Sequence, residues 1–85
     1  SAGFKTFLAS NYADRLAVIE QAAKKKDLKW QQEIKSGLLA HLQQHGVITS
    51  SYAELEYVAR HLLTRGASNK MLLEHAALHL PITIR

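Results

Sequence analysis

The chain of 85 residues contains no cysteine, which excludes disulfide bonds, thiolate zinc sites and thiol nucleophiles. No apolar run approaches the roughly 18 to 20 residues that cross a bilayer, and the N-terminal residues lack the charged start and long apolar stretch of a signal peptide. Internal repeats, low-complexity tracts and linkers are also missing from the sequence. These absences predict a soluble protein outside the membrane, and the lack of cysteine favours a cytoplasmic location.

The composition is typical of one folded domain. Apolar residues make up 47% of the chain and charged residues 21%, which argues against disorder over the whole length. A chain this short buries about 60 to 65% of its unfolded surface, so its core is modest. The last four residues, 82–85, alternate as a strand does but have no visible partner, and they end the chain without a polar tail. A domain excised from a larger protein would end in this way.

Helix signals divide the chain into four segments. The sharpest signals surround one helix, where Ser51 and Glu54 have the spacing of a capping box and Gly66 can end the helix. Asn11 or Ser10 can cap an earlier helix, and Pro81 stops the last one. The predicted helices cover approximately residues 12–26, 28–45, 51–65 and 69–80.

Each predicted helix carries an apolar stripe at helical spacing. Gly37 lies on the second stripe and, because glycine costs about 1 kcal/mol in a helix interior, it predicts a close helix crossing. The short connection between the second and third helices predicts that they pack as neighbours. The fold class is therefore all-α, a small single-domain bundle of three to four helices over residues 1–85. The stripes are Leu16, Ile19 and Ala23; Trp30, Ile34, Leu38 and Leu42; Leu55, Val58, Ala59, Leu62 and Leu63; and Leu72, Leu73, Ala76, Ala77 and Leu80.

The five histidines include two pairs at a spacing of four, His41 with His45 and His75 with His79. Imidazoles at this spacing share a helix face and can bind a divalent metal. A zinc-hydrolase helix also has a glutamate directly after its first histidine, and neither pair has one. We therefore expect histidines that interact with helix C-terminal dipoles or flank the core, with no metal bound. Their titration at about pH 6 to 7 predicts pH-sensitive stability or binding.

No constellation of catalytic residues is visible in the sequence. There is no Gly-rich phosphate loop, no nucleophile elbow and no close pair of carboxylates in an apolar setting. Glu54 and Glu56 stand two residues apart and so face different directions on a helix. A bundle of this size also has little volume for a cleft that excludes water. We expect a protein that is not an enzyme and that binds neither a cofactor nor a small-molecule substrate.

Positive charge is concentrated in one segment. Eleven Lys and Arg against seven Asp and Glu give a net charge of +4. Within residues 24–35 only Asp27 and Glu33 oppose a group of lysines that could contact phosphates without regard to base sequence. These lysines are Lys24, Lys25, Lys26, Lys29 and Lys35.

The run 51–80 permits a DNA-reading interpretation, because Gly66 lies in a turn and the following helix begins with polar residues. The fit is partial: helix-turn-helix motifs generally have a small residue four before that glycine and a β-branched residue nine after it. Leu62 and His75 stand at these positions. From this run we expect additional nucleic-acid contacts from Arg60, Arg65, Asn69 and Lys70.

The predicted function is a non-catalytic nucleic-acid-binding or accessory domain of a DNA- or RNA-processing protein, which uses the lysine-rich helix face. The alternative is a protein–protein interaction adaptor or a self-associating helical module, to which a protein helix docks. Apolar residues that fall off the main stripes support the alternative. They are Leu28, Leu39, Tyr57 and Met71.

Overall fold

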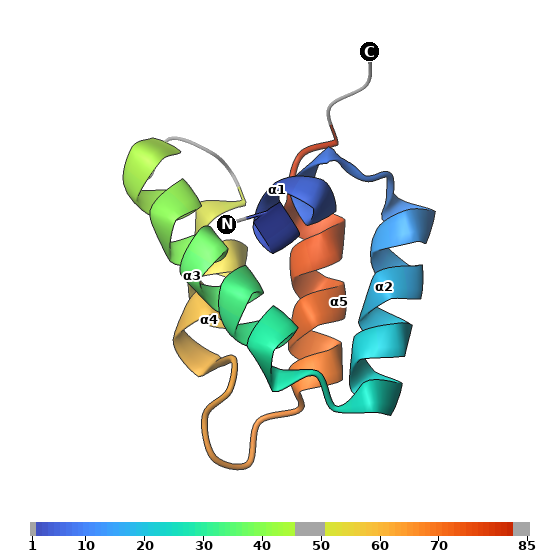
Figure 1. The fold of residues 1–85 in the computed structure, drawn as a ribbon. Coiled ribbons are helices and arrows are strands. Elements are labelled where there is room, and N and C mark those ends of the chain that lie inside the picture. Colours follow the sequence, from blue (N-terminus) through green and yellow to red (C-terminus); the bar gives the residue numbers. More distant parts are fainter. Residues whose placement is uncertain (1, 46–50, 83–85) are drawn as a thin grey trace.

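A computed structural model describes residues 2–45 and 51–82, and these residues form helices without any strand (Figure 1). The all-α fold class is thereby confirmed. None of the described helices combines the length and the apolar character needed to cross a membrane. The predicted helix stop at Gly46 and most of the strand-like end, 83–85, lie outside the described residues. The helices are α1 (Ala2–Ala9), α2 (Tyr12–Lys25), α3 (Leu28–His45), α4 (Tyr52–His61) and α5 (Asn69–His79).

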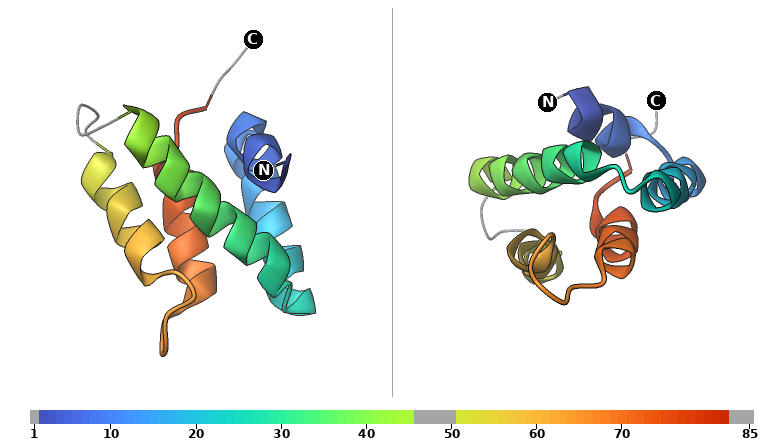
Figure 2. Two further views of the ribbon diagram at one scale, coloured as in Figure 1. Left: turned by 60° about the vertical axis from the view of Figure 1, so that its left-hand side comes forward. Right: turned by 60° about the horizontal axis from the view of Figure 1, so that its bottom comes forward.

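Helix α5 lies between α2 and α4 and packs against both (Figures 1 and 2). Helix α3 crosses the bundle and packs on α4, which confirms the predicted neighbours. The unpredicted helix α1 lies across α3 near the end of α5. The opposite end of the bundle, called here the lower end, holds residues 24–29 and 62–70, where α2 ends, α3 and α5 begin and α4 turns into α5 (Figure 1).

The core draws apolar side chains from all five helices, and it confirms most of the predicted stripes. Burying a Leu, Ile or Phe side chain of this kind contributes about 1.5 to 3 kcal/mol. Trp30 is half-buried and its ring meets Phe7 edge-on at 5.7 Å between centroids. The buried apolar residues that form this core cluster are Phe4, Phe7, Ile19, Ile34, Leu38, Leu42, Leu55, Val58, Ala59, Leu62, Leu73, Ala76, Ala77 and Leu80.

The stripe predicted for α2 is wrong at two of its three positions. Ile19 is buried as expected, but Arg15 and Ala22 are buried, whereas Leu16 and Ala23 are only half-buried. The core face of α2 therefore begins with an arginine, whose relative exposure is 0%. A charged group is buried at such a position only when its polar atoms find partners.

Arg15 satisfies all of its N–H groups with backbone carbonyl oxygens. The Nε atom donates one hydrogen bond, and Nη1 and Nη2 donate two each, at distances of 2.7 to 3.0 Å. Because the acceptors belong to the last turn of α1 and to the end of α5, one cation meets the negative ends of two helix dipoles. Burial lowers the pKa of Arg15, but an arginine stays protonated at neutral pH. The acceptors are the carbonyls of Phe7, Leu8, Ala77, Leu80 and Pro81.

The start of α2 is confirmed, and the capping box predicted for α4 is wrong. At α2, the Asp14 amide donates to Oδ1 of Asn11 at 2.8 Å. At α4, the Ser51 side chain makes no capping hydrogen bond. The Glu54 carboxylate instead accepts a hydrogen bond from His75 of α5, so a contact between helices takes the place of the local one.

Helix α4 ends at His61, before the predicted end at residue 65, because Leu63 takes a left-handed conformation with φ of 64°. Side chains hold this end: Lys35 Nζ donates to the Leu62 carbonyl at 2.5 Å, and Oδ1 of Asn69 accepts from the Leu63 amide at 2.9 Å. The resulting connection, 62–68, is longer than the turn of about three to four residues in a helix-turn-helix motif. Helices α4 and α5 pack as an antiparallel hairpin instead (Figure 2).

The close helix crossing predicted at Gly37 is confirmed, and α1 supplies the partner. A Cβ atom added at Gly37 would lie 2.1 Å from Cγ of Phe4. The ring of Phe4 thus occupies the space that any other residue at position 37 would need. Only glycine lets α1 approach α3 this closely.

The lowered pKa of His41 leads us to expect a loss of stability at mildly acidic pH. Its half-buried ring lies 6.0 Å from the ring of Phe4 and 4.4 Å from that of His45, between centroids. Burial, and secondly the charge of His45, lower the pKa of His41 below its ordinary value of 6.5. The unfolded chain therefore takes up this proton at a higher pH than the folded chain does, and stability falls as the pH drops through that range.

We expect the free energy of unfolding, measured by urea denaturation, to decrease from about pH 7 to about pH 5. In a His41→Gln variant this decrease should be smaller, since the group with the lowered pKa is gone. Equal slopes of stability against pH in the two proteins would contradict the assignment.

Candidate nucleic-acid interface

Four of the predicted lysines gather where α2 turns into α3. Lys24 and Lys25 end α2, Lys26 is its C-cap in a left-handed conformation with φ of 52°, and Lys29 lies in the first turn of α3. All four side chains are exposed, and none of them forms an ion pair within the described residues. Asp27, the acidic residue of this turn, accepts a hydrogen bond from the Trp30 amide at 3.1 Å and so caps α3.

Lys70 extends the positive region onto the start of α5. Its Nζ lies 2.9 Å from Oε1 of Glu20 on α2, and both side chains are about half exposed. The hydrogen bond and charge of Lys70 lower the pKa of Glu20, and Lys24 adds to this effect. Reciprocally, Glu20 raises the pKa of Lys70. Glu20 thus pairs with Lys70 alone, and positive charge remains in excess around the two residues.

A groove of about 340 Å³ lies between these elements, with Lys26 on one wall and Lys70 on the other. Gln31 also lines the groove; the residue is buried, with a relative exposure of 6%, and its buried Oε1 has no hydrogen-bond partner in the described part of the chain. The Ser68 side chain makes no capping bond to α5. The groove therefore combines two ammonium groups with the positive end of a helix dipole.

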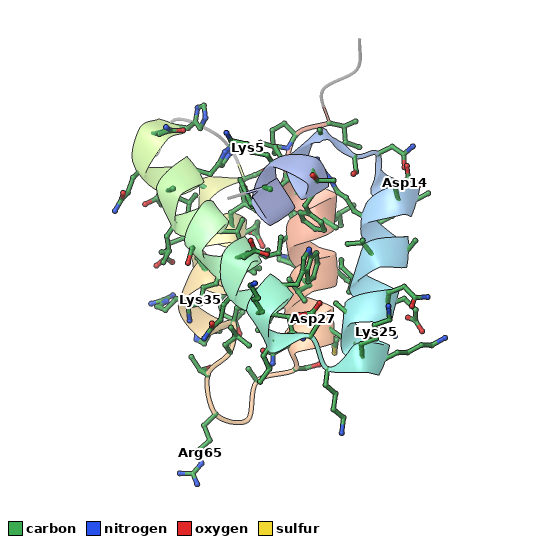
Figure 3. All side chains as sticks on the ribbon, in the orientation of Figure 1. Lys5, Asp14, Lys25, Asp27, Lys35 and Arg65 are labelled. Atoms are coloured by element: carbon green, nitrogen blue, oxygen red, sulfur yellow. The ribbon has the colours of Figure 1, made fainter. Side chains whose placement is uncertain are left out.

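The remaining predicted contact residues do not all join this surface. Lys35 and Asn69 hold the end of α4, as described above. Arg60 pairs with Glu56 one turn away, with Nη2 3.3 Å from Oε1. Arg65 is exposed on the connection 62–68 and projects from the lower end, as Lys25 does (Figure 3). The lower end thus holds Lys24, Lys25, Lys26, Lys29, Arg65 and Lys70, with Arg65 and Lys25 toward opposite sides of it (Figure 3).

A second cluster of polar side chains joins α4 to α5. Nε2 of His75 lies 2.9 Å from Oε1 of Glu54, and the ring of His79 lies 4.4 Å from that of His75 between centroids. The histidine pair is visible in the sequence but its carboxylate is not, because Glu54 stands 21 residues earlier and fits a capping box. Only the hairpin of α4 and α5 brings the three together.

Comparison of the chain with models of protein families, with curated proteins and with solved structures gives no match. The residues and the geometry of this chain alone therefore support the assignments below.

Proposed function

We propose that this domain binds the phosphate backbone of a nucleic acid through its lower end, as a non-catalytic accessory domain. The observation that carries the proposal is the group of exposed lysines at the α2–α3 turn, none of which pairs with a carboxylate among the described residues. Like charges held together at one turn repel one another. A polyanion relieves this repulsion and releases its own counterions.

The proposed binding is independent of base sequence. An ammonium group acts as a point charge toward phosphate and carries no directional readout. The polar residues at the start of α5 are already engaged, Asn69 by the Leu63 amide and Lys70 by Glu20. An exposed pair such as that of Lys70 is worth about 0 to 1 kcal/mol, so Lys70 can exchange Glu20 for a phosphate at little cost.

Replacing the four lysines of the α2–α3 turn with glutamine is expected to weaken binding to a short DNA duplex and to flatten its dependence on salt. Log affinity falls as log salt concentration rises, and each lost phosphate contact reduces the steepness of this slope by about 0.9. Loss of four contacts should therefore reduce the steepness by about 3.6. Fluorescence anisotropy of labelled DNA between about 50 and 200 mM salt measures this slope. Stability should change little, because the side chains are exposed.

Single substitutions provide a matched control. Lys25→Gln removes an exposed lysine from the lower end and should reduce the slope by about 1. Lys5→Gln removes an exposed lysine from α1 near the other end of the bundle and should leave the slope unchanged (Figure 3). Equal effects of the two substitutions, or full affinity in the fourfold variant, would refute the proposed surface.

A second candidate, a protein-binding module, is favoured by one observation. An open groove of about 680 Å³ runs between α4 and α5, and its lining includes Tyr57 and Met71, which are 51% and 68% exposed. Exposed aromatic and methionine side chains are typical of protein interfaces. Under this candidate, binding of an amphipathic partner helix would depend on these two residues and only slightly on salt. Substitutions at Tyr57 and Met71 should leave DNA affinity intact under the first candidate.

A further inference from the structure

We propose that Glu54, His75 and His79 form a binding site for a divalent transition-metal ion. One ligand atom of each residue, a carboxylate oxygen or an imidazole nitrogen, lies within 4.8 Å of those of the other two. All three residues are half-buried, so their polar atoms sit at the surface of the α4–α5 hairpin and an ion can enter from solvent. The cluster lies on α4 and α5 and is separate from the lysines at the α2–α3 turn.

The backbone positions of these ligands are fixed by the core. Glu54 directly precedes the buried Leu55, and His75 directly precedes the buried Ala76 and Ala77. Helices α4 and α5 pack closely through these neighbours. A metal site is precise when rigid elements hold its ligands, and here two packed helices do so.

Two imidazoles and one carboxylate suit zinc and other late first-row metals. Zinc lies about 2.0 to 2.2 Å from such ligands, so neighbouring ligand atoms around it are about 3 to 3.5 Å apart. The 2.9 Å between Oε1 of Glu54 and Nε2 of His75 is close to this spacing, and a ligand nitrogen of His79 lies within 4.8 Å of the ligand atoms of both. The ion would take the place of the Nε2 proton that His75 now donates to Glu54, and the neutral ring would then carry its proton on Nδ1.

Three protein ligands leave a coordination position free for water or for a donor atom of another molecule. Glu54 and His75 also line the open groove between α4 and α5, so this position would face the groove. The inferred site therefore binds an exchangeable ion at the surface, unlike a closed structural zinc site.

The other histidine pair of α3 is a natural control within the same chain. His41 and His45 have the same spacing and the same 4.4 Å between ring centroids as His75 and His79. Among the described residues, however, no acidic side chain completes a cluster of three ligands around His41 and His45. A difference in affinity between the two pairs thus reports on the carboxylate and its placement.

Titration of the full chain with zinc chloride, followed by calorimetry and by the NMR signals of the histidine rings, tests the site. We expect one saturable ion per chain, with the largest shifts at His75 and His79. Glu54→Gln and His79→Gln should each weaken binding by about 10-fold or more, whereas His45→Gln should leave it unchanged. Circular dichroism checks that each variant is folded, and the ring signals of the unmodified chain locate the ion without any substitution.

Three results would overturn the proposal. Zinc could fail to bind in a saturable way, or it could shift His41 and His45 as strongly as His75 and His79. Unchanged affinity in a folded Glu54→Gln variant would also overturn it, because the carboxylate would then not be a ligand.

Discussion

Replacement of Arg15 by methionine is expected to lower the free energy of unfolding by about 3 to 5 kcal/mol. The change leaves five carbonyl oxygens at the ends of α1 and α5 without the donors they now have. A domain of 85 residues has about 4 to 13 kcal/mol of stability in total, so this loss removes roughly a quarter of the total or more. Urea denaturation followed by circular dichroism measures the loss.

Two further variants separate the geometry of Arg15 from its charge and from the chemistry of the substitution. Arg15→Lys keeps the charge but offers three donors without the planar fork, so an intermediate loss is expected. Arg60→Met makes the same chemical change at an exposed arginine paired with Glu56, where we expect a change of about 0.5 kcal/mol or less. Similar losses in Arg15→Met and Arg60→Met would be incompatible with the role assigned to Arg15.

Substitution of alanine for Gly37 is expected to destabilise the protein by about 2 kcal/mol or more. This change in stability has the opposite sign to the usual one, because alanine in a helix interior is normally more favourable than glycine by about 1 kcal/mol. The added Cβ would lie 2.1 Å from Cγ and 2.4 Å from Cβ of Phe4, so α1 has to move away from α3. The measurement is again the free energy of unfolding in urea.

A double-mutant cycle tests whether the Phe4 ring is the cause. In a Phe4→Ala background the ring is gone, and Gly37→Ala should then cost little or become favourable. Ser36→Ala, at the exposed neighbouring position of α3, should be nearly neutral or slightly stabilising. If Gly37→Ala costs the same with and without Phe4, the close crossing of α1 and α3 is not its origin.

Local signals predicted the helices from residue 12 onward but missed α1. The bounds of α3 match the prediction, and Asn11 caps α2 as expected. Helix α1 has only eight residues, and isolated helices of that length do not form in water. It is stabilised by packing, with Phe4 against Gly37 and Phe7 against Trp30, and neither contact can be read from a local pattern.

The errors within the helices have a common physical reason, which is a partner on another helix. Arg15 is not part of the predicted apolar stripe of α2, because the carbonyl groups that satisfy it lie on α1 and at the end of α5. Glu54 was assigned to capping, yet its partner is His75. For the candidate site, the sequence indicated the lysines of the α2–α3 turn. It could not indicate that Lys35 holds the end of α4 or that Lys70 pairs with Glu20.

The most direct test of the proposed nucleic-acid surface is an amide chemical-shift titration of the labelled chain with a short DNA duplex at low and at high salt. We predict shifts confined to the lower end, at residues 24–29 and 65–70, that are strong at low salt and fade at high salt. No shifts at low salt, or shifts centred on Tyr57 and Met71 that persist at high salt, would contradict the account and favour a protein partner in the α4–α5 groove.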